Sequence, residues 1–177
     1  MEKTKKAQVW VETVIYTLIG LTIIGVILAI ATPAIDKYKD EILLEQTISA
    51  LNKVNDEISE TKETVGNSRI VEFRIKKGNI LIDAQNEKII YTLEESRLEY
   101  SQPEKSVEQG DIEILTSKRG KKYDISLKLA YLEDNIDLRY NDKNENKIFN
   151  QAPIPYKWYI ENNGTFEGKI QINIKEL

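Results

Sequence analysis

The feature that most constrains this chain is a long run without charge near its N-terminus. Between Glu12 and Asp36 no residue is charged, and residues 13–35 read TVIYTLIGLTIIGVILAIATPAI. About 20 apolar residues in a helix cross the hydrocarbon core of a bilayer. A helix that is apolar on every side also needs an apolar environment on every side. We therefore expect residues 13–35 to span a membrane, rather than to form the core helix of a soluble domain.

The charges that flank this run predict its orientation. Lys3, Lys5 and Lys6 precede it, and positively charged residues favour the cytoplasmic side of a membrane. The N-terminus is therefore expected in the cytoplasm and everything after Asp36 outside the cell. The sequence thus predicts a single-pass protein of the cell membrane whose bulk faces the exterior.

Helical periodicity continues beyond the uncharged run. Apolar residues recur at steps of three and four in two runs, with polar residues between them: first Ile35, Tyr38 and Ile42, and then Leu44, Ile48, Leu51, Val54 and Ile58. We predict one helix over residues 8–65, roughly 80 Å long at 1.5 Å per residue, which ends at Gly66-Asn67. Pro33 removes one backbone hydrogen bond within it and predicts a kink. The second half of this helix must pack on something outside the membrane.

The composition excludes several classes of function. The chain has neither cysteine nor histidine, so disulfides, thiolate catalysis, His-ligated metals and a serine triad are all unavailable. Its 25 basic and 29 acidic side chains give a net charge of -4, whereas nucleic-acid binding normally needs a basic face. We expect neither an enzyme nor a cofactor, and no nucleic-acid partner.

From residue 66 to 177 the pattern changes to short alternating or β-branched runs separated by turn residues, which is typical of antiparallel strands. Strands are predicted within residues 69–76, 80–83, 88–93, 112–117, 123–131, 135–140, 156–161 and 169–175. Successive hairpins are expected across 77–79, 85–87, 118–121 and 162–164, and residues 102–110 are expected to form a loop. The predicted fold class is α+β, a long helix followed by a compact antiparallel β-rich head.

A motif directly before the apolar run carries a family resemblance. The stretch reads Lys5-Lys6-Ala7-Gln8-Val9-Trp10-Val11-Glu12-Thr13. It resembles the class III, prepilin-type signal peptide of archaeal type IV pilins and archaellins. In that family a short basic leader ends in a small residue, Gln follows, and a Glu stands fifth in the mature chain. Glu12 is fifth when Gln8 is counted first, although Trp10 stands where common members have Ser.

The resemblance implies a processing and assembly route. A prepilin peptidase, an aspartyl protease of the membrane, would cut between Ala7 and Gln8 and remove residues 1–7. Other copies of the chain or related pilins would then be partners in a filament for adhesion, motility or surface interaction. A cytoplasmic assembly ATPase and a membrane platform would drive the assembly. The likeness covers residues 1 to about 58, and the head resembles no family.

Elementary electrostatics gives Glu12 a role in such an assembly. A carboxylate inside a membrane is costly, so it needs a cationic partner. The freed amine of Gln8 on a neighbouring subunit would supply one and would set the register between helices. The alternative is that Glu12 merely lies in the headgroup layer. Gly20 and Gly25 would allow close helix approach.

Three other functions stay open at this point. The chain is expected to be a main filament subunit, but a minor pilin or a secretion pseudopilin would read the same. A bitopic membrane-anchored binding module that does not polymerise is a third reading. A simple membrane anchor does not need an amphipathic helix that continues to Ile58, so this reading does not explain the apolar periodicity. Ordinary secretion is the fourth, because Ala29-Ile30-Ala31 resembles a signal-peptidase site.

Three signals in the head are weaker. Asp142, Asn144 and Asn146 place oxygens at alternate positions as a calcium loop does, but Lys147 and Pro153 stand where an EF-hand needs Gly and Glu. The hairpin around Gly120 is rich in Lys and Arg and could touch anionic groups, although a solvated turn is the ordinary explanation. Asn163-Gly164-Thr165 fits an N-glycosylation acceptor, with Asn163 as the modified residue.

Overall fold

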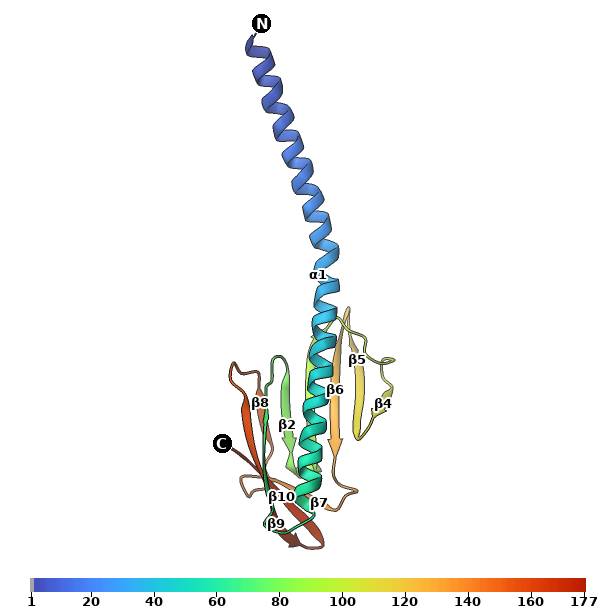
Figure 1. Cartoon of the computed structure of the whole chain (residues 1–177). Helices are drawn as coiled ribbons and strands as arrows, with labels where there is room; N and C mark the ends of the chain where they lie inside the picture. Colours follow the sequence, from blue (N-terminus) through green and yellow to red (C-terminus); the bar gives the residue numbers. More distant parts are fainter. Residues whose placement is uncertain (1) are drawn as a thin grey trace. The chain divides into compact units, whose positions relative to one another are not determined.

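The computed structural model describes residues 2–177, with side chains from Val9 onward. Its helices are α1 (Glu2–Lys62) and the short 3-10 helix η1 (Ala84–Asn86) (Figure 1). Its strands are β1 (Ser68–Phe73), β2 (Asn79–Asp83), β3 (Lys88–Ser96), β4 (Ser106–Gln109), β5 (Ile112–Arg119), β6 (Lys122–Ala130), β7 (Ile136–Tyr140), β8 (Lys147–Asn150), β9 (Tyr156–Phe166) and β10 (Lys169–Glu176). This confirms the predicted fold class, a long N-terminal helix followed by a β-rich domain.

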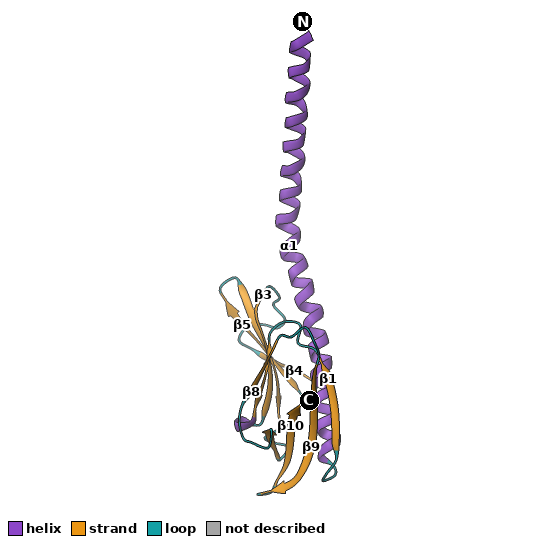
Figure 2. Ribbon diagram, turned by 90° about the vertical axis from the view of Figure 1, so that its left-hand side faces the viewer, coloured by secondary structure: helices purple, strands orange, loops and turns teal. Residues whose placement is uncertain are grey.

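The chain divides into two compact units. The first ends at Lys39 and the second spans Asp40–Leu177. Residues 40–62 of α1, which we call the outer segment, therefore belong to the same compact unit as the strands (Figure 2). We call this second unit the head.

The strands of the head form two sheets. Sheet A has the order β1-β9-β10-β7, and sheet B has the order β4-β5-β6-β3-β2-β8. Within the described residues every strand pairing is antiparallel except β7 with β10, which is parallel. The predicted antiparallel character of the head holds for the other pairs, and this parallel pair departs from it. Between β7 and β10 the chain forms β8 in sheet B and then β9 in sheet A. Parallel strands need a long connection of this kind.

The first predicted hairpin was wrong. β1 pairs with β9, whereas β2 pairs with β3 and β8, so residues 74–78 carry the chain from sheet A to sheet B. Gly78 in this connection has φ +79, and a Cβ built there would lie 2.2 Å from the Thr92 carbonyl oxygen. Only glycine fits this turn, but the turn joins two sheets rather than two paired strands.

Further differences concern short or irregular strands. The expected loop 102–110 contains the edge strand β4, whose four residues are all exposed and show no alternation. Strand β8 was not predicted, and residues 162–164 lie inside β9 rather than in a turn. A register shift between Ile170 and Ile172 of β10 accommodates this irregular part of β9. The hairpins β2–β3 and β5–β6 formed as predicted.

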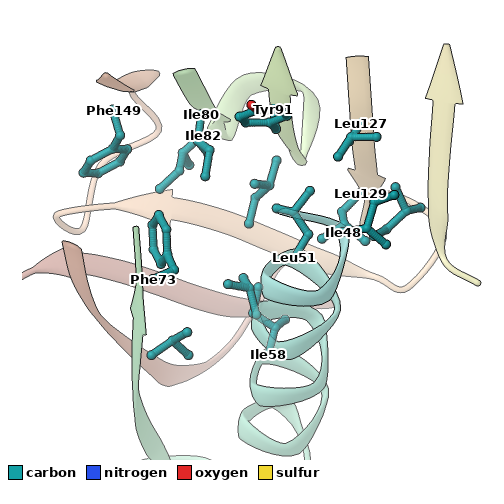
Figure 3. Close-up of a cluster of buried hydrophobic side chains, with 14 of the residues drawn as sticks. Ile48, Leu51, Ile58, Phe73, Ile80, Ile82, Tyr91, Leu127, Leu129 and Phe149 are labelled. Carbon is teal, nitrogen blue, oxygen red and sulfur yellow. The ribbon is translucent and has the colours of Figure 1, made fainter. Parts of the chain in front are cut away.

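The hydrophobic core lies between the two sheets and the outer segment. Five helical residues at steps of three and four face the strands and are almost fully buried: Leu44, Ile48, Leu51, Val54 and Ile58. Figure 3 shows Ile48, Leu51 and Ile58 of the helix pointing toward residues of both sheets. Burying one such side chain contributes about 1.5–3 kcal/mol. The second half of the helix thus does pack outside the apolar run, and its partner is the chain's own head.

The end of α1 is fixed by a buried asparagine. The helix ends at Lys62, a few residues before the predicted Gly66-Asn67. Asn162 of β9 donates its side-chain amide to the carbonyl oxygens of Thr61 and Lys62, at 3.2 and 3.1 Å. The last carbonyls of a helix have no partner within it. A residue that lies far away in the sequence, in a strand of sheet A, therefore satisfies them.

Candidate functional site

The apolar segment of α1, which we define as residues 9–35, is exposed along most of its length. Its large side chains are at least half exposed at most positions, for example Trp10 at 71%, Leu21 at 61% and Ile30 at 70%. α1 is long and apolar enough to cross a membrane, and its most apolar stretch is not buried. The hydrophobic surface of this segment is therefore free to meet lipid or other helices.

The threonine hydroxyls of the apolar segment are satisfied within the helix itself. The hydroxyls of four threonines donate to the carbonyl oxygen four residues earlier, at 2.7–2.9 Å: Thr13, Thr17, Thr22 and Thr32. A hydroxyl left without a partner in hydrocarbon is costly. Because these donors are already paired, the segment suits an apolar surrounding.

Glu12 lies near the start of this segment, and its side chain is exposed. The backbone of Lys5, Lys6, Ala7 and Gln8 belongs to α1, while their side chains lie outside the described ones. In a helix, residues four apart share a face, so Gln8 and Glu12 are one turn apart on the same side. Cleavage between Ala7 and Gln8, and the role of Glu12, stay predictions.

Three small or rigid residues vary the surface of the apolar segment. Gly20 and Gly25 have no atom within 4 Å of the position of a Cβ, so they leave flat places at which another helix can approach closely. Pro33 lies inside α1, whose helical assignment runs unbroken from Glu2 to Lys62. The kink predicted at Pro33 stays a prediction.

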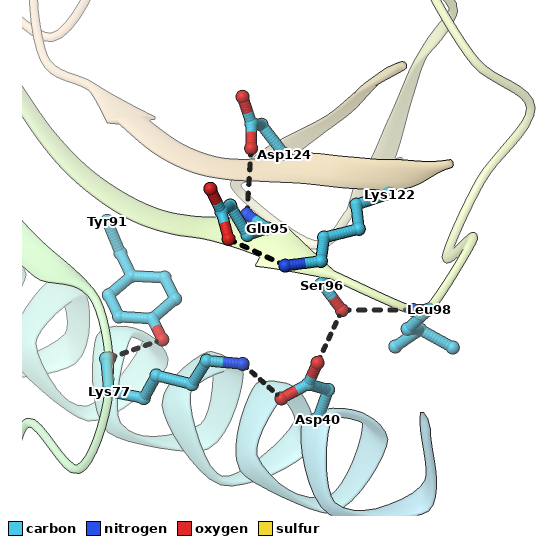
Figure 4. Close-up of polar contacts among 8 residues, drawn as sticks. All are labelled: Asp40, Lys77, Tyr91, Glu95, Ser96, Leu98, Lys122 and Asp124. Carbon is cyan, nitrogen blue, oxygen red and sulfur yellow. Dashed lines mark hydrogen bonds and ion pairs between the residues drawn. The ribbon is translucent and has the colours of Figure 1, made fainter. Parts of the chain in front are cut away.

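A buried carboxylate marks the point where the head begins. Asp40 is only 6% exposed. It accepts hydrogen bonds from Lys77 Nζ at 2.6 Å and from Ser96 Oγ at 2.8 Å (Figure 4). The hydroxyl of Ser96 also accepts from the Leu98 amide at 3.0 Å, and Tyr91 donates its hydroxyl to the Lys77 carbonyl at 2.8 Å. We call this end of the head, around Asp40, the proximal end, and the end around Lys62 the distal end.

The Asp40 cluster ties three parts of the head together. Asp40 comes from α1, Lys77 from the connection between the sheets, and Ser96 from the end of β3. Sequence reasoning missed it, because one Asp among many helical acids carries no signal. Burial of the Tyr91 side chain raises the pKa of its phenol, which therefore stays a hydrogen-bond donor at neutral pH.

The apolar periodicity of α1 splits into two opposite faces near this junction. Leu44 is fully buried, but Ile42 is 55% exposed and Tyr38 is 66% exposed. With 3.6 residues per turn, Ile42 and Leu44 point in nearly opposite directions. The sequence pattern joined them into one stripe, whereas Tyr38 and Ile42 lie on the exposed side of the helix and the apolar residues that contact the core begin with Leu43 and Leu44.

The weak calcium candidate is not assembled as an oxygen cage. Asp142 Oδ1 accepts from the side-chain amides of Asn173 and Asn163 at 2.7 and 3.0 Å, and its Oδ2 lies 3.3 Å from Lys175 Nζ. Asn146 accepts from the Gln85 backbone instead, so the structure does not bring it together with Asp142. No group of three or more acidic side chains that could hold a metal occurs in the part of the chain described.

The glycosylation candidate lies in a strand. Asn163 belongs to β9 and is exposed, but its side-chain amide donates to Asp142 at 3.0 Å. Attaching a glycan to this nitrogen would replace one of its two hydrogens and leave a single N–H to donate to Asp142. Modification at Asn163 stays a prediction.

Comparison with protein-family models, with curated proteins and with solved structures finds no match to this chain. The residues themselves therefore carry the function. The apolar segment has an open surface, whereas the outer segment is packed into the head.

Proposed function

We propose that this chain is a structural subunit of an archaeal type IV pilus-like surface filament. It would polymerise through its N-terminal helix after a prepilin-type leader is removed. The observation that carries the proposal is the exposed apolar segment with Glu12 at its start, preceded by the motif from Lys5 to Gln8. Such a segment can lie in lipid before assembly and among other helices afterwards, because both surroundings are apolar.

The chemistry of assembly would centre on two charges. Cleavage before Gln8 creates a new α-amine at the start of the mature helix. In a bundle of helices this amine can pair with Glu12 of a neighbour, so that neither charge enters the apolar core alone. The pair also favours one axial offset between helices over others, since any other offset leaves two charges unpaired.

The remaining parts of the proposal concern location and partners. The lysines before the apolar segment favour a cytoplasmic N-terminus with the head outside the cell. A prepilin peptidase, an assembly ATPase and a membrane platform would be needed for processing and extrusion. The heads would then form the outer surface of the filament and serve adhesion, motility or surface interaction.

A specific observation supports a second candidate, a bitopic membrane-anchored module that does not polymerise. The five apolar residues of the outer segment are buried in the chain's own head. The apolar stripe that continues to Ile58 is therefore covered by the chain itself and does not require contact with a second subunit. What separates the two functions is whether the apolar segment ends up among other helices or stays in lipid.

The test is processing coupled to filament formation. Replacing Ala7 with Arg puts a bulky charge at the predicted cleavage site, whereas Ala7→Ser keeps a small residue as the matched control. We expect the Arg variant to accumulate as precursor in the membrane without surface filaments, and the Ser variant to behave like wild type. Filaments of the Arg variant at wild-type yield would refute the processing route. A wild-type chain never found in sheared filaments would favour the bitopic module.

A further inference from the structure

The hairpin between β5 and β6 presents positive charge at the proximal end. Its tip consists of Lys118, Arg119, Gly120, Lys121 and Lys122, which we call the basic tip. Lys122 pairs with Glu95 at 2.6 Å (Figure 4), and Glu95 directly precedes Ser96 of the Asp40 cluster. The basic tip therefore lies at the same end of the head as Asp40.

Two of the four cations of the tip are not used inside the head. Arg119 pairs with Asp124 at 2.7 Å and with Glu94 at 3.8 Å, and Lys122 is taken by Glu95. Lys118 and Lys121 are exposed, and their ammonium groups have no ionic partner among the residues that the structure describes. These two charges are available to a partner outside the chain.

The distal end carries a polar groove of about 640 Å³, far more than the roughly 30 Å³ that one water occupies in the liquid. We call it the distal groove. It lies between the outer segment and sheet B. Its exposed carboxylates come from β4, from the turn before β5 and from the connection after β6: Glu108, Asp111, Glu133 and Asp134.

Most of these carboxylates lack a cation of their own. Asp134 lies 3.6 Å from Lys62 Nζ, and Asp111 accepts only the neutral amide of Asn55, at 2.8 Å. Glu108 and Glu133 have no ionic partner within residues 9–177. Three lysines line the groove. Lys62 is paired with Asp134 and Lys128 with Glu113, so Lys88 alone is left to offset the remaining negative charge.

A buried donor at the same place is also without a partner. Tyr131 lines the distal groove and is only 2% exposed. Its hydroxyl has no hydrogen-bond partner in the described part of the chain, and a buried hydroxyl without one is costly. Burial raises the pKa of this phenol, and the negative charges of Asp134 and Asp111 raise it further.

The basic tip and the distal groove cannot meet within one head. The outer segment runs from Asp40 at the proximal end to Lys62 at the distal end, which corresponds to about 30 Å at 1.5 Å per residue. Strand β5 likewise connects the two sites, with Ile112 next to the groove and Arg119 in the tip. Complementary sites at opposite ends of one body give a head-to-tail contact, which builds an open filament unless the rotation between copies closes it into a ring.

We infer that the basic tip of one subunit docks into the distal groove of another copy of the same chain. Lys118 and Lys121 would supply the unpaired cations and Glu108, Asp111 and Glu133 the carboxylates without cations. This inference rests on the proposed function, because it gives the filament a contact between heads in addition to the contact between helices. Complementary charges at such an interface fix partner and register more than they add affinity.

The absence of cysteine from the chain permits a direct test in filaments and membranes of cells. The variant Lys121→Cys with Glu133→Cys carries one thiol in the basic tip and one at the distal groove. With a short bis-maleimide, we expect a ladder of dimers, trimers and higher multimers from this double variant. Each single variant should give no ladder. The matched control, Lys143→Cys with Glu133→Cys, moves the first thiol to an exposed loop away from the tip and should also give no ladder.

Charge exchange provides the second arm. Lys118→Glu with Lys121→Glu should reduce filament yield at least fivefold, and adding Glu108→Lys with Glu133→Lys should restore most of it. Lys143→Glu, another exposed reversal, should leave the yield unchanged. A double-cysteine chain that forms normal filaments without a ladder would overturn the docking contact while leaving the proposed function intact. A ladder without filaments would support the contact and count against the filament.

The same variants test the other partner for the basic tip, an anionic membrane surface. If Lys118→Glu with Lys121→Glu removes binding of the detergent-solubilised chain to vesicles rich in phosphatidylglycerol, and the distal reversals do not restore it, the tip serves lipid. Such a result together with the absence of a ladder would refute docking between heads.

Discussion

The two halves of α1 contain the same apolar residue types, Leu, Ile and Val, but bury them in opposite ways. In the apolar segment Leu, Ile and Val stand on every side of the helix and are exposed, as Leu21 at 61% and Ile24 at 55% illustrate. In the outer segment most of them stand on one side, where Leu44, Leu51 and Ile58 are at most 1% exposed, and Ile42 is the exposed exception at 55%. The distribution around the helix, rather than hydrophobicity itself, decides which half finds its partner inside the chain.

This difference gives the two halves different structural roles. The outer segment is part of the head, where it contributes to the core and is held at its two ends by Asp40 and Asn162. The apolar segment contributes nothing to that core. Changes in one half should therefore affect stability of the head, and changes in the other should affect membrane insertion and assembly.

The largest effect is expected at the single charge of the apolar segment. Glu12→Gln keeps size and removes charge, so membrane insertion should be normal or improved. Assembly should fail, because breaking a buried ion pair by removing one partner costs about 3–5 kcal/mol. Glu12→Asp keeps the charge on a shorter side chain and should be milder. The measurement is the ratio of subunit in sheared filaments to subunit in membranes.

Head stability serves as the control for the Glu12 series. All three proteins should show the same denaturant unfolding of the head, because Glu12 lies outside the second unit. Equal filament yields from wild type, Asp and Gln would show that Glu12 merely lies among lipid headgroups.

The next largest effect compares two leucines of the same helix. Leu51→Ala should destabilise the head by about 2–5 kcal/mol, the usual cost of removing a buried leucine side chain. Leu21→Ala should leave the free energy of unfolding of the head unchanged. Unfolding can be followed in detergent micelles by the fluorescence of Trp158, which is fully buried, in a Trp10→Phe background. Similar losses from both variants would contradict the division of α1 into two units.

A smaller effect is expected at the proximal end. Asp40→Ala leaves the Ser96 hydroxyl without its acceptor and Lys77 without its partner. The cost should be about 1–3 kcal/mol, because Lys77 is 42% exposed and can be hydrated. Asp40→Asn retains one acceptor and should cost less. The same unfolding experiment measures both, and an Asn variant less stable than the Ala variant would argue against this account of the cluster.

Much of the fold could be predicted because it depends on local patterns. The uncharged run, the three- and four-residue steps after it and the alternation beyond residue 68 each have one physical interpretation. The hairpins β2–β3 and β5–β6 were also predictable, because each joins two strands that are adjacent in the sequence. The pairing of β1 with β9 and of β7 with β10 was not, because it joins strands separated by long stretches of sequence and depends on how two sheets share one core.

The candidate site was predictable only where a motif lies along the chain. The stretch from Lys5 to Glu12 is contiguous, so the sequence alone suggests it as a motif, and its role stays a prediction. The Asp40 cluster, the distal groove around Tyr131 and the cap formed by Asn162 each combine residues from distant elements. Their residues follow no regular spacing in the sequence that would predict these clusters. The edge strand β4 was missed for another reason, since its exposed residues show no alternation.

The most direct test of the central claim is to identify the first residue of the mature chain. The mass of the chain can be measured after isolation from membranes and from sheared surface material. The account predicts that the mature chain begins at Gln8, with residues 1–7 removed and the apolar segment intact. A chain that begins at Thr32 would indicate ordinary secretion after Ala31, and one that retains Met1 would indicate an uncleaved anchor. Either result would contradict assembly through a prepilin-type helix.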